Sequence, residues 1–294
     1  MNEKLKLFQK VEKILEEKNF NYLAVRSCFD IIAKKDKLFL LKVLFNVDGL
    51  LESHAKSMRA MAHFLSANPF VISEVNNREK LLDGVVYERY ELPVVTSNTF
   101  ENILDGYVSI SFSAKGRHTV EIDVNVLKEK RRKMNYSLKK LADLVGISKK
   151  AMYEIESQRV NPKESTAKRL EKILDVNLIK KYEPKIPEKV EIKPRDRFTL
   201  TISRKLQSIG IDNSYIYSKT FNLVGRIDKS LISFVGVKPK KESVKQIEEI
   251  SDIASSYAVV ISKKYDMFLD VPSISEEKLK KIKNPKELKE VLGL

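Results

Sequence analysis

The sequence contains one cysteine, three histidines and no tryptophan. A single thiol, Cys28, excludes an intramolecular disulfide and is typical of a chain kept in a reducing compartment. The three histidines, His54, His63 and His118, have no partners at the spacing of metal ligands, so we expect no metal site. No Gly-rich phosphate loop is present either, and we expect no cofactor.

Long apolar runs are also missing. No uncharged apolar stretch reaches the roughly 18 residues of a membrane-spanning helix, so we expect no membrane partner. The first turns of the chain are amphipathic but charged throughout, without the apolar core of a signal peptide. We therefore expect a cytoplasmic protein. At 294 residues the chain has room for two or three domains, each with its own core.

The charge is strongly basic and unevenly distributed. Lys and Arg number 55 against 40 Asp and Glu, a net charge of +15. Residues 123–181 hold 16 basic and 8 acidic residues, which is about half of the excess in a fifth of the length. A basic excess concentrated on one segment favours a phosphate-bearing partner such as nucleic acid. Charge alone does not decide this, because lysine-rich surfaces also occur in thermophile proteins.

The same segment has the apolar spacing of short helices. We predict helices at 124–134, 138–145, 149–157 and 163–174. Ser137 and Ser148 stand just before the second and third, where a hydroxyl can accept backbone N–H groups. Gly146 separates these two helices and can adopt the positive φ of a tight turn.

This stretch, with the run LKEKRRKMNYSLKKLADLVGISKKAMYEIE, resembles the helix-turn-helix domain of the lambda-repressor (Cro-type, XRE) family. The resemblance implies a structural ion pair between Arg131 and Glu156. It also implies base readout in the major groove from the third helix, by Lys149, Lys150, Tyr153 and Glu154. Lysine can donate to guanine and glutamate can accept from cytosine N4.

Phosphate contacts are expected from residues around the same two helices, namely Lys128, Arg132, Ser137, Lys139, Lys140, Ser148 and Arg159. The sequence departs from the family at Leu138, where a glutamine often braces a phosphate. Lys139 and Lys140 can take over that contact. The alternative interpretation is a helical bundle whose lysine face contacts protein.

Both flanks of this segment have mixed α/β patterns. The N-terminal flank predicts a helix at 5–18, strands at 22–33 and 38–45, a helix at 51–67, a strand at 69–73 and a β-hairpin within 107–122. The C-terminal flank repeats this order at low identity, so we predict a duplicated fold. The expected domains are 1–122 (α/β with the hairpin), 123–182 (all-α, DNA-binding), a Pro- and Lys-rich linker at 183–197, and 198–294 (α/β).

The element order of the flanks resembles a degenerate PD-(D/E)xK nuclease fold. That family holds Mg²⁺ with carboxylates and uses a nearby lysine, because a hard cation needs oxygen ligands. Asp30 and Lys42 stand at two of the family positions, but Leu40 replaces the second acid. In the C-terminal flank we match the three positions to Asn222, Ile232 and Phe234. We therefore expect a vestigial site and no enzyme.

Lys42 lies within an apolar strand, and an unpaired buried charge is costly. We expect it to pair with Asp30, Glu12 or Glu16.

The whole arrangement resembles archaeal HTH-type transcriptional regulators with a mid-chain DNA-binding unit. That resemblance implies a nucleoid-associated, sequence-specific regulator whose partners are double-stranded DNA, a second copy of the chain and the transcription machinery. We expect the homodimer to be held through an α/β flank, on a partly palindromic site. The alternatives are a DNA-processing or structure-specific protein using the nuclease-like fold, a non-specific architectural binder, and a coactivator-like adaptor.

Overall fold

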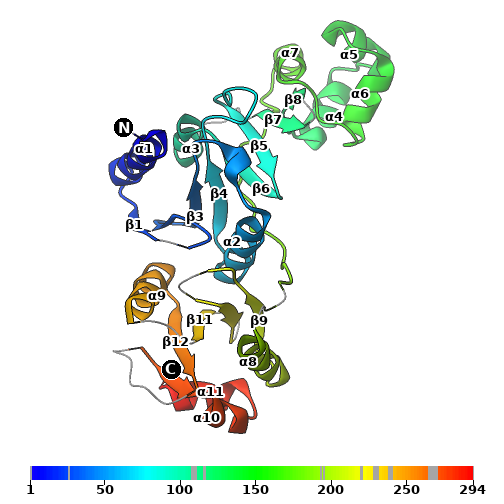
Figure 1. Cartoon of the computed structure of the whole chain (residues 1–294). Helices are drawn as coiled ribbons and strands as arrows, with labels where there is room; N and C mark the ends of the chain where they lie inside the picture. Colours follow the sequence, from blue (N-terminus) through cyan, green and yellow to red (C-terminus); the bar gives the residue numbers. More distant parts are fainter. Residues whose placement is uncertain are drawn as a thin grey trace. The chain divides into compact units, whose positions relative to one another are not determined.

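A computed structural model describes residues 2–25, 27–106, 111–114, 117–192, 194, 196–218, 221–227, 232–237, 241–263 and 271–293. The fold is mixed α/β with an all-α group of helices in the middle of the chain (Figure 1). The chain forms two compact units. The first contains Met1–Asn77, Arg89–Leu92 and Pro184–Leu294, and the second Arg78–Glu88 and Pro93–Glu183.

The N-terminal half of the first unit is a small sheet with two helices. Its elements are α1 (Glu3–Glu17), β1 (Asn21–Ala24), β2 (Ile31–Lys34), β3 (Leu38–Val43), the 3-10 turn η1 (Val47–Gly49), α2 (Glu52–Leu65) and β4 (Asn68–Ile72). The strands lie in the order β1-β2-β3-β4. The first two pairings are antiparallel and β3 pairs with β4 in parallel, so α2 is the crossover helix. Every residue of β3 is buried, as its apolar sequence, interrupted only by Lys42, predicts.

The predicted single strand at 22–33 is wrong. The chain leaves the sheet after Ala24 and returns at Ile31. A loop closed by the Val25 N–H donating to the Asp30 carbonyl, at 2.8 Å, separates the two strands. Neither glycine nor proline marks this turn, so the apolar pattern runs through it without a signal.

The C-terminal half of the first unit has the same order of elements, with an addition at its end. They are α8 (Arg197–Ser208), β9 (Asp212–Tyr215), β10 (Leu223–Arg226), β11 (Ile232–Val237), α9 (Lys241–Ala254), β12 (Tyr257–Ser262), β13 (Ser273–Ser275), α10 (Glu276–Lys281) and α11 (Pro285–Leu292). Strands β9 to β12 pair with the same directions as β1 to β4. Strand β13 extends the sheet in parallel beside β12.

Strand register corrects the predicted match between the halves at the third strand. Leu41 lies opposite Ile31 in the first half, and Val235 lies opposite Leu223 in the second. Gly236 therefore stands at the position of Lys42. By the same register Phe234 corresponds to Leu40, so the predicted pairs Ile232 with Leu40 and Phe234 with Lys42 are wrong by two residues. The cause is the connection before β11, which is two residues longer than that before β3.

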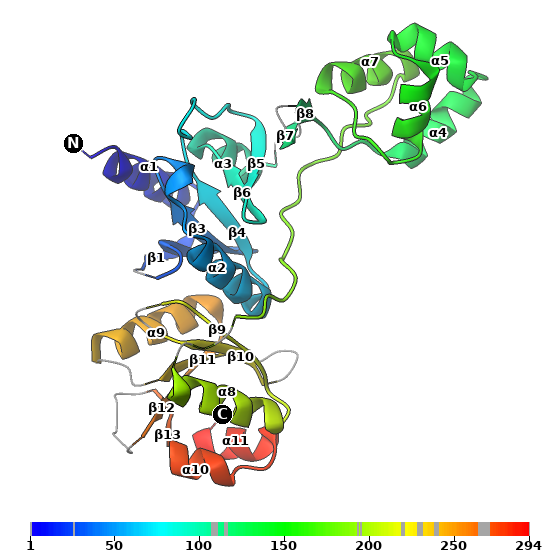
Figure 2. The same cartoon turned by 45° about the vertical axis from the view of Figure 1, so that its right-hand side comes forward.

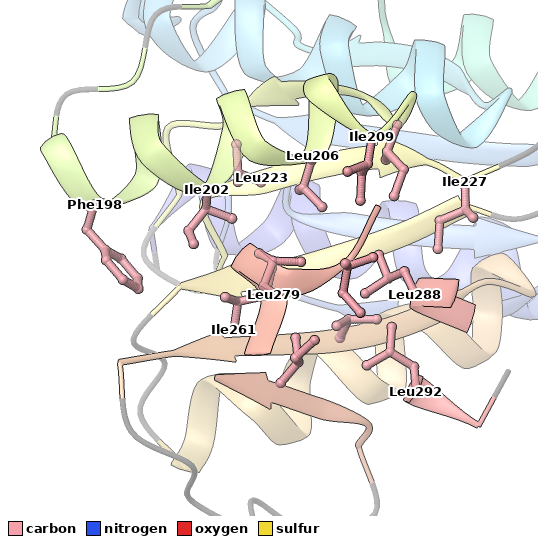
Figure 3. Close-up of a cluster of buried hydrophobic side chains, with 14 of the residues drawn as sticks. Phe198, Ile202, Leu206, Ile209, Leu223, Ile227, Ile261, Leu279, Leu288 and Leu292 are labelled. Atoms are coloured by element: carbon pink, nitrogen blue, oxygen red, sulfur yellow. The ribbon is translucent and has the colours of Figure 1, made fainter. Parts of the chain in front are cut away.

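The core of the C-terminal half lies between α8, the sheet and the last two helices. Figure 3 shows Phe198, Ile202 and Leu206 of α8 turned toward the layer that holds Ile261 of β12 and Leu279 of α10. All five side chains are buried. The first helix of this half, α8, and its last two helices, α10 and α11, contribute side chains to the same apolar core. The two added helices are therefore part of this domain's core.

The second unit contains a small sheet and the central helices. Its first elements are most of β5 (Val85–Arg89) and β6 (Leu92–Val95), then α3 (Ser97–Leu104), β7 (Ser111–Ala114) and β8 (Arg117–Thr119). The strand order is β6-β5-β7-β8. Strands β7 and β8 form an antiparallel pair within the predicted hairpin. The hairpin residues 107–110 and 115–116 lie outside the described residues.

Candidate DNA-binding site

Four helices in the second unit form the site. They are α4 (Val124–Lys133), α5 (Leu138–Val145), α6 (Lys149–Glu156) and α7 (Glu164–Leu174), drawn in green in Figures 1 and 2. Their bounds agree with the predicted helices to within one residue. Local sequence therefore determines these elements, and tertiary contacts orient them.

Polar side chains begin the helices, and a glycine ends α5. Ser137 Oγ accepts from the Lys140 N–H at 3.1 Å, and Ser148 Oγ accepts from the Ala151 N–H at 3.0 Å. Each hydroxyl satisfies one backbone donor that the helix itself leaves unpaired. Gly146 has φ 74°, the left-handed conformation that closes α5. The turn from α5 to α6 is therefore fixed by its own sequence.

The core of this helical group also includes the chain segments that enter and leave it. Val120 and Ile122 are buried with the apolar faces of α5, α6 and α7. The Asp123 N–H donates to the Leu178 carbonyl at 2.7 Å, so the entering and leaving segments lie side by side. Glu171 on α7 holds the leaving segment, because its Oε1 accepts from the N–H groups of residues 178 and 179 at 2.7 and 2.9 Å. Sequence reasoning missed Glu171, which has no helix-turn-helix signal of its own.

Arg131 and Glu156 form the expected pair between α4 and the end of α6. Arg131 Nε donates to Glu156 Oε1 at 2.5 Å, and Nη2 donates to Oε2 at 3.1 Å. Nη1 donates to the Tyr136 carbonyl at 2.9 Å, which adds the turn before α5 to the same network. The hydrogen bonds to Glu156 raise the pKa of Arg131. Glu156 is only 6% exposed, so this pair is far less screened than a surface ion pair.

The four residues predicted to read bases lie on α6, and Arg159 contacts two of them. Lys149, Lys150 and Tyr153 are exposed, while Glu154 is half-buried. Arg159, predicted as a phosphate contact, follows the helix and meets two of them. Its guanidinium lies 5.6 Å from the centre of the Tyr153 ring and its Nη1 lies 3.6 Å from Glu154 Oε1. The arginine therefore holds the tyrosine and glutamate on one side of α6.

The other predicted phosphate contacts surround α5 and the end of α4. Arg132, Lys139 and Lys140 are exposed, and Lys128 is half-buried. Ser137 and Ser148 use their oxygens to accept N–H groups, which leaves each hydroxyl proton to donate. The N-termini of α5 and α6 also carry the partial positive charge that favours an anion. The arrangement presents cations and helix N-termini on the same two helices.

The vestigial nuclease positions lie in the first unit. Lys42 Nζ lies 3.1 Å from Asp30 Oδ1, and Asp30 Oδ2 accepts from the Val43 N–H at 2.8 Å. Of the three acids expected as partners of Lys42, Asp30 is thus bonded to it, while Glu16 accepts from the Tyr22 hydroxyl at 2.7 Å. Leu40 is fully buried and supplies no oxygen. Among the described residues, no three His, Cys, Asp or Glu side chains gather as a metal site.

Two helices joined by a tight turn, braced by a buried ion pair and lined with lysines, define a helix-turn-helix DNA-binding domain. Comparison with known proteins agrees with this class. Residues 127–180 match the model of the helix-turn-helix family, and residues 4–108 match that of the PD-(D/E)XK superfamily domain. The first match lies in the second unit and confirms the predicted resemblance.

Similar proteins occur in archaea. A "Putative HTH-type transcriptional regulatory protein" of Methanocaldococcus jannaschii is 32% identical over 278 residues, which cover 90% of this chain and 87% of that protein. A protein of the same name from Methanobrevibacter smithii is 29% identical over 310 residues, covering 98% and 96%. The chain belongs to this family of archaeal HTH-type transcriptional regulators. No solved structure matches the chain.

Within the described part of the chain, no helix is long and apolar enough to cross a bilayer.

Proposed function

We propose that the chain is a sequence-specific transcriptional regulator that binds double-stranded DNA as a homodimer, with α6 in the major groove. The observation that carries this proposal is the exposure of Lys149, Lys150 and Tyr153 on a helix whose far end is locked by Glu156. A rigid helix with exposed cationic and aromatic side chains suits base readout. We assign these contacts to a DNA-binding domain at 123–182.

Base recognition would use the exposed face of α6. Lys149 and Lys150 would donate to guanine O6 and N7, and Glu154 would accept from cytosine N4. Arg159 holds Glu154 and Tyr153 in the absence of DNA. On DNA this arginine would exchange Glu154 for a phosphate, and the carboxylate would then become available to a base.

Phosphate contacts would set the register of the domain. Lys139 and Lys140, together with the N-terminus of α5 and Ser137, would grip one strand. Ser148 at the start of α6, with Lys128 and Arg132, would extend this contact. Such contacts carry no sequence information directly, but they supply much of the affinity.

We propose a homodimer because of the number of base pairs that one recognition helix can contact. One recognition helix reads too few base pairs for useful specificity, so two are placed about one turn of DNA apart. The site would then be partly palindromic. Binding near a promoter would bring the protein to the transcription machinery and keep it on the nucleoid.

The PD-(D/E)XK domain is proposed to be a scaffold without cleavage. Both oxygens of Asp30 are engaged by Lys42 and by the Val43 N–H, and Leu40 stands where the fold needs a second acid. A nuclease or structure-specific function would therefore need ligands that these positions do not supply. Incubation of branched and linear DNA with Mg²⁺ or Mn²⁺ tests this, and cleavage would refute the scaffold role.

Two substitutions test the DNA-binding proposal. Lys150→Ala removes a base contact, so it should cost about 1–3 kcal/mol at the best site and relax base preference there. Lys140→Ala removes a phosphate contact and is the matched control. It should weaken all sequences alike and lower the slope of log K against log salt by about one. Fluorescence anisotropy on selected and scrambled duplexes measures both. An unchanged preference in Lys150→Ala would show that α6 does not read bases.

A further inference from the structure

The two halves of the first unit contact each other through equivalent elements. Helix α2 of the N-terminal half packs on β9 and β10, and α9 of the C-terminal half packs on β1 and β2. Each crossover helix also packs on two strands of its own half. Figure 2 shows both helices between the two sheets. Helix α2 is accordingly buried on more than one face, with Ala55, Met58, Ala60 and Met61 fully enclosed.

The same polar contact occurs twice across this interface. Lys34, the last residue of β2, donates through Nζ to Ser255 Oγ at 2.6 Å, just beyond the end of α9. Arg226, the last residue of β10, reaches the end of α2 in the same way: its Nη2 donates to the Phe64 carbonyl at 2.9 Å and, at 3.4 Å, to Ser66 Oγ just beyond that helix. Both serines have the left-handed conformation, with φ 52° at Ser255 and 53° at Ser66. Lys34 and Arg226 are equivalent in the duplicated fold, and so are the two serines.

One residue meets its own counterpart. Ser27 and Ser218 each stand three residues beyond the end of the first strand of their half. Ser27 Oγ donates to Ser218 Oγ at 3.1 Å. Contact between equivalent residues marks a two-fold axis, and reciprocal contacts around such an axis define an isologous interface. The halves are therefore joined as the subunits of a symmetric dimer are joined.

The segment before α8, which includes residues 187–190, is anchored to both halves of the first unit. His63 Nδ1 of α2 lies 3.1 Å from the Pro187 carbonyl, and Ser214 of β9 donates to the Val190 carbonyl at 3.0 Å. Lys189 forms an ion pair with Asp212. The segment predicted as a linker thus runs against α2 and then against β9. These contacts favour pairing of the two halves within one polypeptide.

We infer that each chain is a built-in dimer of two nuclease-like halves, whose C-terminal half occupies the surface that a second copy would use. This closes the isologous face of the flanks to self-association. The homodimer proposed for DNA binding then forms through a different surface of the protein. If an α/β flank holds the homodimer, as the sequence predicts, it does so through a surface other than the one between the two halves.

A disulfide placed on the pseudo-two-fold axis tests the inference in the full chain. The variant carries Ser27→Cys and Ser218→Cys in a Cys28→Ala background, which removes the native thiol. Mild oxidation should yield one chain-length species with raised mobility on a non-reducing gel, in a yield independent of protein concentration. Each single-cysteine variant is the control and should stay unshifted.

Two outcomes would overturn the inference. A species of twice the chain mass, specific to the double variant and growing with concentration, would mean that halves of different chains pair. Absence of any disulfide in the folded double variant would mean that the axis contact does not form.

Lysine cross-linking of an equimolar mixture of unlabelled and ¹⁵N-labelled wild-type protein repeats the test without substitutions. Peptides linking the halves should then be all light or all heavy, and mixed pairs would refute closure within one chain. DNA binding is measured separately, so failure here leaves the recognition proposal intact.

Discussion

Arg131 and Glu156 form a two-point ion pair that joins α4 to the end of α6 with little access to solvent. Glu156→Ala would leave the guanidinium partly buried without its carboxylate. We expect a loss of about 2–4 kcal/mol in the free energy of unfolding, measured by urea titration with circular dichroism. Glu154→Ala on the same helix is the control, because its looser pair with Arg159 should contribute less than about 1 kcal/mol. Equal losses would contradict the bracing role of Glu156.

His54 makes the stability of the first unit sensitive to acid. Burial lowers its pKa from 6.5, the nearby Lys42 lowers it further and Asp30 opposes the shift. A lowered pKa means that unfolding takes up a proton, so the contribution to stability is complete above the ordinary pKa. It is lost as the pH falls through the folded-state value.

Unfolding free energies measured between about pH 7 and 5 test this effect. The wild-type protein should lose more stability over that range than His54→Gln, whose amide does not titrate. If the unfolding free energies of the two proteins fell equally with pH, His54 would not be the cause of the acid sensitivity.

At the scale of elements, the core of the C-terminal half has a small defect. A cavity of about 20 Å³ is lined by Leu206 of α8, Val259 of β12, Leu288 of α11 and five other apolar side chains. Val259→Ile adds one methylene and should raise stability by about 0.5–1 kcal/mol. Val259→Ala enlarges the space and should cost roughly 1–3 kcal/mol. Thermal unfolding measures both, and a destabilised isoleucine variant would mean that the site cannot accept the added group.

The sequence predicts the helix-turn-helix elements almost completely because their determinants are local. Each has an apolar face, a serine before it or a glycine after it, and a partner only a few residues away. The Arg131–Glu156 pair also follows, because the family resemblance gives both positions. Elements β5, β6 and α3 were not predicted. Strands β5 and β6 are short and lie side by side, joined by a two-residue turn at Tyr90 and Glu91. Both turn residues have positive φ, and neither is the glycine or asparagine that would mark such a turn in the sequence.

The flanking strands show where the pattern fails. The turn between β1 and β2 is closed by backbone hydrogen bonds from Val25 to Asp30 and from Ser27 to Phe29, without glycine or proline to mark it. The longer connection before β11 shifts the register of the second half, and no sequence periodicity reports the length of a loop. The sequence match therefore pairs Lys42 with Phe234, whereas the register pairs it with Gly236; neither residue carries a basic group.

At the scale of the whole molecule, the duplication was visible in sequence but its consequence was not. Equivalent positions such as Lys34 and Arg226 gave no sign that each reaches a serine in the opposite half. Isologous pairing depends on contacts separated by about two-thirds of the chain, and sequence patterns report only local periodicity. The structure thus shows that the two weakly similar repeats contact each other through equivalent residues.

The most direct test of sequence-specific recognition is selection from a random duplex library by purified full-length protein at near-physiological salt. It should be run in parallel with Lys150→Ala, and with and without Mg²⁺. We predict a recurrent motif of two related half-sites, altered by the substitution and indifferent to the metal, with the recovered DNA intact. Uniform recovery of library sequences would contradict recognition by α6, and cleavage dependent on Mg²⁺ would contradict the scaffold role of the nuclease-like domain.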